Sequence, residues 1–244
     1  ASVLELPVDR ERPEVLSGVG VTHRFVVPGM VRDSLLGLAA REGVTLFMVL
    51  IAAFDAVLSR WTDTTDIVIG TQVANRIKPE LESLIGFFVN TVVLRTDVSG
   101  DPTFRDLLAR VREVTLGAYA HQDLPFERLT QDLRGGTAST AKGQRKPLVD
   151  VLFQLDESPS PTLSLPDVAV EALSIETHAP KFALTVMLWD RPDEGLAGGI
   201  EYFVELFDEA TISAIVDAMH SILAWAVANP DRPLSQWIWP PQGL

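Results

Sequence analysis

The sequence predicts an α/β fold of the α+β sandwich kind, in which a mixed β-sheet is packed with helices. Two observations carry this prediction. Several segments have apolar residues at the helical period of 3.6, and the segments between and after them are short, β-branched apolar runs. Helices and strands alternate in the first half and strands cluster in the second, an order typical of a mixed sheet. We expect residues 1–244 to form a single domain.

Four helices are predicted from apolar periodicity and capping signals. The strongest covers Leu46 to Leu58, behind Thr45 as a good N-cap residue. Another begins after Pro102, where Thr103 and Asp106 have the spacing of a capping box. The other two are expected over residues 31–41, closed by a glycine at position 43, and over residues 208–229.

Six strands are predicted where β-branched or alternating apolar residues form short runs. They cover residues 23–27, 66–70, 89–95, 148–155, 182–189 and 197–203. The last two are expected to form a hairpin across Asp193, Glu194 and Gly195, because a glycine there allows a positive φ.

Composition excludes several classes of function. The chain has 20 Lys and Arg against 33 Asp and Glu, a formal net charge of −13. This charge repels phosphate backbones and anionic lipid headgroups, so we expect no nucleic-acid and no membrane partner. The absence of cysteine excludes disulfides, thiolate zinc sites and a thiol nucleophile, and fits a cytoplasmic location. The longest apolar run, Leu46–Val57, has 12 residues and contains Asp55, whereas a membrane span needs about 20.

The sequence lacks the common catalytic and nucleotide-binding motifs. It contains no G-x-S-x-G, no G-x-x-x-x-G-K-[ST] and no G-x-G-x-x-G. None of the four histidines has an acidic residue four positions later that could orient it as a base. Asp123 follows His121, but residues i and i+2 do not face each other on a helix, so we interpret His121 as structural or loop-capping. No metal site is expected. The pattern is that of an α/β enzyme scaffold without a catalytic centre.

Six stretches of sequence stand out in order along the chain. They are LPVDRERP (residues 6–13), EGVTLFMVLIAAFDAVLSRW (42–61), DIVIGTQVANR (66–76), IGFFVNTVVLRTD (85–97), HQDLPFERL (121–129) and LFDEATI (206–212). Together they closely resemble the later half of the condensation domains of nonribosomal peptide synthetases. The resemblance extends over nearly the whole chain.

The resemblance implies one lobe of a two-lobed domain, each lobe being similar to chloramphenicol acetyltransferase. The catalytic motif of the family, H-H-x-x-x-D-G, belongs to the first lobe, and this sequence has no His-His pair. The chain therefore resembles the C-terminal lobe, with residues 1–20 as an inter-lobe linker and residues of about 156–180 as a latch-like crossover. Its start at Ala1 fits a piece of a longer polypeptide.

By resemblance, the intact domain forms a peptide bond between a donor aminoacyl or peptidyl thioester and an acceptor amine. Both substrates would arrive on the phosphopantetheine arms of carrier proteins, and no cofactor would bind this chain directly. The implied partners are the N-terminal lobe, carrier proteins and adjacent synthetase domains. Because the catalytic motif is missing, the chain alone is expected to be inactive.

The segment IGFFVNT is the best candidate for a wall of the substrate tunnel. Phe87 and Phe88 offer rigid apolar surface, while Asn90 and Thr91 offer amide and hydroxyl hydrogen bonds. The alternative for the aromatic residues is ordinary strand core. Asn90 is the stronger functional candidate, because an amide within an apolar strand needs a partner.

Residues 134–147 are rich in Gly, Ser and Thr, carry four positive charges and no acid, and are predicted to be a mobile surface loop. Arg145 and Lys146 lie in a block that resembles a family segment near the tunnel, although the family often has Asn or His in place of Lys146. Arg134 and Lys142 are candidates for contact with a carrier protein or its phosphopantetheine arm, because a local positive patch attracts anions. The alternative is an exposed, solvated loop.

Three functions stay open from the sequence, of which we favour the first. The first is the C-terminal lobe of a peptide-bond-forming condensation domain. The second is a non-catalytic condensation-like module that recruits a carrier protein or a tailoring enzyme. The third is an acetyltransferase-like oligomer with a site between subunits. An intact H-H-x-x-x-D-G upstream would favour the first function, and a degraded one the second. The third needs a base, which only His121 or His178 could supply.

Overall fold

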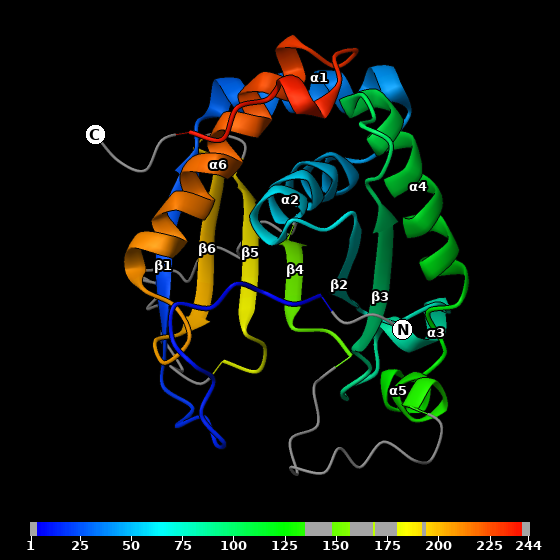
Figure 1. The fold of residues 1–244 in the computed structure, drawn as a ribbon. Helices are drawn as coiled ribbons and strands as arrows, with labels where there is room; N and C mark the ends of the chain where they lie inside the picture. The colour runs from blue at the N-terminus through cyan, green and yellow to red at the C-terminus, as the bar shows by residue number, and fades with distance from the viewer. Residues whose placement is uncertain (1–3, 135–147, 157–167, 169–179, 192–193, 241–244) are drawn as a thin grey trace.

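The computed structural model describes residues 4–134, 148–156, 168, 180–191 and 194–240 (Figure 1). Its strands are β1 Gly20–Val27, β2 Asp66–Val73, β3 Asn90–Asp97, β4 Val151–Asp156, β5 Leu184–Arg191 and β6 Gly195–Phe203. Its helices are α1 Gly29–Glu42, α2 Leu46–Thr62, α3 Pro79–Glu82, α4 Phe104–Ala120, α5 Phe126–Arg134 and α6 Glu209–Ala228, followed by a short 3₁₀ turn, Leu234–Gln236.

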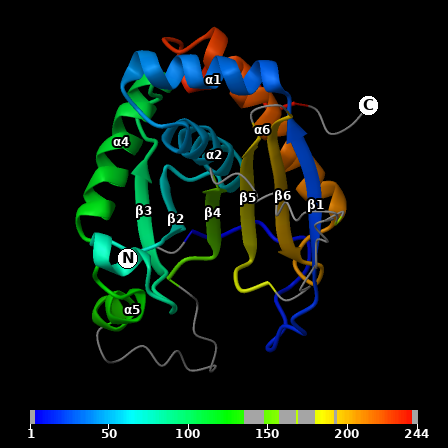
Figure 2. The ribbon, with the colours of Figure 1, turned by 180° about the vertical axis from the view of Figure 1, so that it is seen from behind.

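The strands form one sheet in the order β1-β6-β5-β4-β2-β3. β4 runs parallel to both β5 and β2, and all other neighbours are antiparallel. The predicted mixed sheet with packed helices is therefore confirmed. α2 packs against α4 on one side and α6 on the other, and α1 crosses the top of the molecule in both views (Figures 1 and 2).

α2 is the centre of the hydrophobic core. The Thr45 side chain accepts a hydrogen bond from the backbone N–H of Met48 (3.2 Å), which confirms the predicted N-cap. Every residue from Met48 to Leu58 is buried, because sheet residues such as Phe153 meet one side of the helix and α4 and α6 cover the others. The helix therefore fixes the sheet to both flanking helices.

The predicted caps and hairpin are also present. In α4, the Thr103 hydroxyl accepts from the Asp106 N–H and the Asp106 carboxylate accepts from the Thr103 N–H, each at 3.1 Å, which is a capping box. Gly195 begins β6 with φ of 103°, and a Cβ there would lie 2.3 Å from the Val27 carbonyl oxygen. The hairpin turn therefore requires a glycine at this position.

The described part of the predicted linker lies against the start of α6. Asp9 accepts hydrogen bonds from the backbone N–H of Asp208 (2.7 Å) and from the Thr211 hydroxyl (3.0 Å), and its own N–H donates to the Leu206 carbonyl (2.9 Å). Arg10 pairs with Asp208 and donates to the Val204 carbonyl. The segment is thus fastened to this domain by its side chains and backbone.

Two short helices were not predicted. α3 follows β2, and α5 begins directly after Pro125, where the sequence predicted only a turn. α6 has the length and hydropathy of a membrane span, yet half of that stretch is buried within the protein. The predicted basic loop and latch-like crossover lie almost entirely outside the described residues: Arg134 ends α5, while Lys142, Arg145 and Lys146 are among the residues that are not described.

Candidate functional site

β2 and β4 are joined at a single residue pair. Gly70 pairs with Leu152, and both strands continue beyond this point, to Val73 and Asp156, without further pairing to each other. In contrast, β4 pairs with β5 along its whole length. The sheet is therefore divided into a four-stranded part, β1-β6-β5-β4, and a two-stranded part, β2-β3. We call the junction between β2 and β4 the seam.

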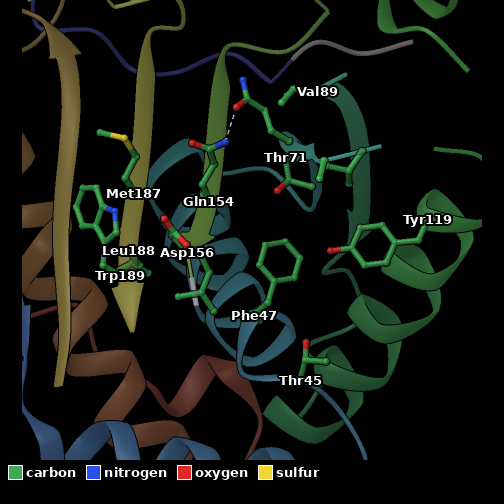
Figure 3. A pocket seen from close by; sticks show the side chains of 14 residues that line it. Thr45, Phe47, Thr71, Val89, Tyr119, Gln154, Asp156, Met187, Leu188 and Trp189 are labelled. Carbon is green, nitrogen blue, oxygen red and sulfur yellow. Dashed lines mark hydrogen bonds between the residues drawn. The ribbon is translucent and has the colours of Figure 1, made fainter. Parts of the chain in front are cut away.

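A cavity of about 920 Å³ lies where the two strands diverge, and we call it the seam cavity (Figure 3). It is lined by β2, β4 and β5, by Phe47 at the start of α2 and by Tyr119 near the end of α4. Consecutive residues of β2, Thr71 and Gln72, both line it, although side chains alternate between the faces of a strand. Residues from both faces of β2 therefore border the cavity.

A glutamine pair spans the seam beside this cavity. Gln154 Nε2 of β4 donates to Gln72 Oε1 of β2 at 2.6 Å, and both residues stand two positions after the Gly70–Leu152 pair. Figure 3 shows this bond at the upper edge of the cavity. Side chains thus connect the two parts of the sheet where backbone pairing has ended.

A second cavity, of about 420 Å³, brings together four of the six residues that were predicted to line the tunnel: Phe87, Phe88, Asn90 and Thr91. The other two, Arg145 and Lys146, lie outside the described residues. We call it the rim cavity. Its other sides come from the start of α5 and from Lys181 and Phe182 before β5. Gln72 and Val89 line both cavities, so the rim cavity and the seam cavity adjoin.

Asn90 has a complete set of partners within the chain. Its Nδ2 donates to the carbonyls of Gln122 and Leu124, both at 2.8 Å, and its Oδ1 accepts from the backbone N–H of Phe126 at 3.1 Å. The amide therefore ties the first residue of β3 to the turn between α4 and α5 and satisfies the first N–H of α5. An amide in an apolar strand was expected to need a hydrogen-bond partner, and the backbone of the α4–α5 turn is that partner.

The two phenylalanines differ in their surroundings. Phe87 is 90% exposed, whereas Phe88 is partly buried and has the Arg76 guanidinium 4.4 Å from its ring centroid. Arg76 is itself anchored, because it donates to the Leu81 carbonyl at the end of α3. The Arg76 guanidinium thus holds the Phe88 ring in place. Phe87 and the fully exposed Ile85 instead point into solvent.

The charged side chains of the rim cavity are Lys181, Asp123 and Glu127. His121 lies directly after α4, where its backbone N–H donates to the Ala118 carbonyl (3.1 Å). Within the part of the chain that the structure describes, no group of three or more His, Asp and Glu side chains has the arrangement of a metal site.

A family model described as "Condensation domain" matches residues 1–243. The chain belongs to the condensation-domain family. It is 42% identical over 235 residues to a linear gramicidin synthase protein of Brevibacillus parabrevis, a match that covers 96% of this chain and 4% of that protein. It is 39% identical over 236 residues to a dimodular nonribosomal peptide synthase of Bacillus subtilis strain 168, a match that covers 95% of this chain and 10% of that protein.

Solved structures show the same fold. The X-domain from teicoplanin biosynthesis has a TM-score of 0.85 at 28% identity, covering 98% of this condensation-family chain and 54% of that chain. The four-domain nonribosomal peptide synthetase AB3403 has a TM-score of 0.86 at 23% identity, covering 97% of this chain and 19% of that one, and supports the fold alone. This chain therefore spans about half of the X-domain.

Sequence reasoning placed the rim but missed the seam cavity. Gln72, Gln154, Tyr119 and Trp189 line that cavity and were not singled out. Gln72 and Gln154 are amide side chains in largely apolar strands, which is the same signal that pointed to Asn90. Applied to all strands, this signal would have indicated each glutamine, but not that the two meet.

Proposed function

We propose that this chain is the C-terminal lobe of a condensation domain and supplies one wall of a site that joins two carrier-bound substrates. One observation carries the proposal: residues 1–243 match the condensation family, yet the chain spans only about half of a related X-domain. The sequence supports it further, since the H-H-x-x-x-D-G motif is absent.

In the proposed reaction, the acceptor amine attacks the carbonyl carbon of the donor thioester. A C–N bond forms, the C–S bond breaks, and the amine proton ends on the departing phosphopantetheine sulfur. A histidine of the N-terminal lobe would serve as the base, so this lobe contributes placement rather than proton transfer. Holding two tethered reactants within attack distance yields effective molarities of roughly 10⁵ M or more.

Three features of the rim fit this role. Leu84, Ile85 and Phe87 are exposed apolar side chains close together in the chain, and clustered exposed apolar side chains mark surfaces that interact with other molecules. Asn90 holds the rim to the α4–α5 turn and acts as a positioning residue, while Thr91 lines the rim cavity. We assign Phe87, Phe88 and Thr91 to the tunnel wall, and the exposed Phe87 also to contact with the N-terminal lobe, which would form the facing wall.

The positive residues at the end of α5 and beyond it keep their proposed roles. Arg145 and Lys146 are assigned to the tunnel, and Arg134 and Lys142 to the anionic surface or the phosphopantetheine arm of a carrier protein. A local patch of positive charge is useful here, because the chain as a whole carries −13 and repels acidic partners. We further propose that adjacent synthetase domains are partners of this chain and that it acts in the cytoplasm.

A second function is a non-catalytic module that recruits another protein. One observation favours it: a solved complex of the teicoplanin X-domain with OxyB contains a chain that is 28% identical to this one, with a TM-score of 0.84. An X-domain of this fold thus binds a second protein.

A single-turnover assay with a loaded donor carrier and a loaded acceptor carrier tests the proposal. We expect no amide product from this chain alone, and product when a separately produced N-terminal lobe is added. Product from the chain alone at the rate of the intact domain would overturn the assignment. Carrier binding without product, in an intact two-lobed protein, would instead support the recruiting module.

A further inference from the structure

The seam is closed at one end by close packing. At Gly70, a Cβ would lie 3.1 Å from Val149, 3.2 Å from Leu152 and 3.3 Å from Thr91. No larger residue fits there without displacing its neighbours. Beyond Gly70 the strands separate and the seam cavity begins. The opening therefore has a fixed end and widens in the direction in which β2 and β4 run.

The Gln72–Gln154 bond stands at the boundary between the two cavities. Gln72 lines both of them, and Gln154 lines only the seam cavity. A hydrogen bond between two amides that water can reach is easily exchanged for bonds to water or to a ligand, because its net contribution is about 1 kcal/mol. The pair can therefore separate at little energetic cost, unlike the packed contacts at Gly70.

The lining of the seam cavity is suited to uncharged groups. Phe47, Tyr119 and Trp189 provide aromatic surface, and Met187 and Leu188 provide aliphatic surface. Among its described lining residues, Asp156 is the only charged one and none is cationic. A volume of about 920 Å³ is within the range of ligand sites and exceeds that of one amino-acid side chain.

We propose that the seam cavity receives the apolar or aromatic side chain of a carrier-tethered substrate, and that Gln72 and Gln154 determine which side chains enter. This inference rests on the proposed function, since the tethered end of the substrate would lie in the rim cavity. An aspartyl or glutamyl side chain is disfavoured, because the described lining offers it no cation and one carboxylate.

Occupancy can be measured without any catalysis, because the chain has no cysteine of its own. Met187→Cys places a single thiol in the seam cavity, and Gln131→Cys places one on the exposed surface of α5 as the matched control. The probes are phenylalanine and aspartate joined to aminopantetheine, in which an amide replaces the thioester, so that they cannot transfer the aminoacyl group and carry no thiol of their own. The measured quantity is the rate at which a maleimide modifies each thiol.

We expect the phenylalanyl probe to slow modification of Met187→Cys at least tenfold, the aspartyl probe to have less than a twofold effect, and neither probe to affect Gln131→Cys. Where Met187→Cys does not fold, Gln154→Cys at the boundary serves the same purpose. Equal protection by both probes, or none at saturating concentration, would overturn the inference. Protection of Met187→Cys in this chain, together with no amide product from the intact two-lobed protein, would leave the inference standing and reject the proposed function.

The selecting role of the glutamines is tested in the intact condensation domain. Gln154→Ala removes the bond across the seam, and Gln131→Ala is the control. We expect Gln154→Ala to change the ratio of kcat/KM for phenylalanyl and alanyl substrates by about tenfold in favour of the larger one, as a change of a few methylene-sized contacts allows. An unchanged ratio with an unchanged unfolding transition would refute this role.

Discussion

Phe54 in α2 and Phe87 in the loop before β3 have opposite surroundings. Phe54 is fully buried and stacks against Phe153 with ring centroids 5.3 Å apart, whereas Phe87 is 90% exposed. The first side chain is explained by folding, because its burial contributes to stability. The second is not, since an exposed aromatic side chain adds nothing to the folded state. The difference separates residues that stabilise the fold from an exposed residue that the proposed function assigns to contact with another protein lobe.

The same contrast applies to the sheet. β4, β5, β6 and β1 are paired along long stretches of backbone, while the backbones of β2 and β4 pair at one residue pair. A sheet built only for stability would continue this pairing. The interruption leaves the seam cavity, which is where the inferred substrate site lies.

The largest expected effect is on the core. Phe54→Ala should lower the free energy of unfolding by about 3–5 kcal/mol, because it leaves a cavity among well-packed neighbours. Phe87→Ala should change it by less than about 0.5 kcal/mol. Denaturant titration of both variants checks this pair. A loss for Phe87→Ala as large as that for Phe54→Ala would remove the distinction between core and rim.

Asn90 should lie between these extremes. Asn90→Ala removes three hydrogen bonds to the α4–α5 turn, so we expect a loss of about 1–3 kcal/mol. Amide hydrogen exchange should show faster opening of α5 than of α2, because only α5 loses its tie. Thr91→Ala is the control, since Thr91 lines the same rim cavity but its side chain does not make the hydrogen bonds that Asn90 makes to the α4–α5 turn. Unchanged exchange in α5 would show that Asn90 does not hold the turn.

Asp55 makes stability depend on pH. Burial raises the pKa of Asp55 to about 7, and the Thr96 hydroxyl offsets only part of this shift. The folded state therefore holds a proton between pH 4 and 7 that the unfolded state has released, so the contribution of this group is lost as pH rises from about 4 through 7. Asp55→Asn removes this titration while keeping the size of the side chain.

Relative to the natural chain, Asp55→Asn should gain at least about 1 kcal/mol in unfolding free energy between pH 5 and pH 8. Thermal or chemical unfolding at several pH values measures this difference, in which the contributions of all other groups cancel. A difference that is constant with pH would mean that Asp55 ionises at its ordinary pKa.

The smallest expected effect is at the exposed edge of the sheet. Arg95 pairs with Asp66 across β2 and β3 through two bonds of 2.7 and 2.8 Å, and this carboxylate raises the pKa of the guanidinium. Because water surrounds the pair, Arg95→Ala should leave the unfolding midpoint unchanged at about 0.15 M salt. A clear loss of stability would show that this edge depends on its ion pairs.

Much of the fold could be predicted from the sequence, because the signals for α2, α4, α6 and the strands are local. The N-cap at Thr45 and the capping box at Thr103 depend on residues three positions apart. α5 was missed because the sequence at Pro125 was interpreted only as a turn, whereas its start is capped by Asn90, 36 residues earlier. The sequence therefore predicted that the Asn90 amide has a hydrogen-bond partner, but not that this partner is the turn between α4 and α5.

The site was only partly predictable for the same reason. The motif around Phe87 and Asn90 is contiguous, so the sequence indicates the rim. The seam cavity depends on where β2 and β4 stop pairing, and on Gln72 and Gln154, which are 82 residues apart. No local pattern reports a gap between two distant strands.

The central claim is that the rim around Phe87 is a surface for the other lobe rather than a part of this lobe's core. Its most direct test is the dissociation constant between this chain and a separately produced N-terminal lobe, measured by sedimentation. Phe87→Asp should raise it at least tenfold, whereas Met30→Asp, at an equally exposed position at the start of α1, should leave it unchanged. Equal dissociation constants for the natural chain and Phe87→Asp would contradict the claim.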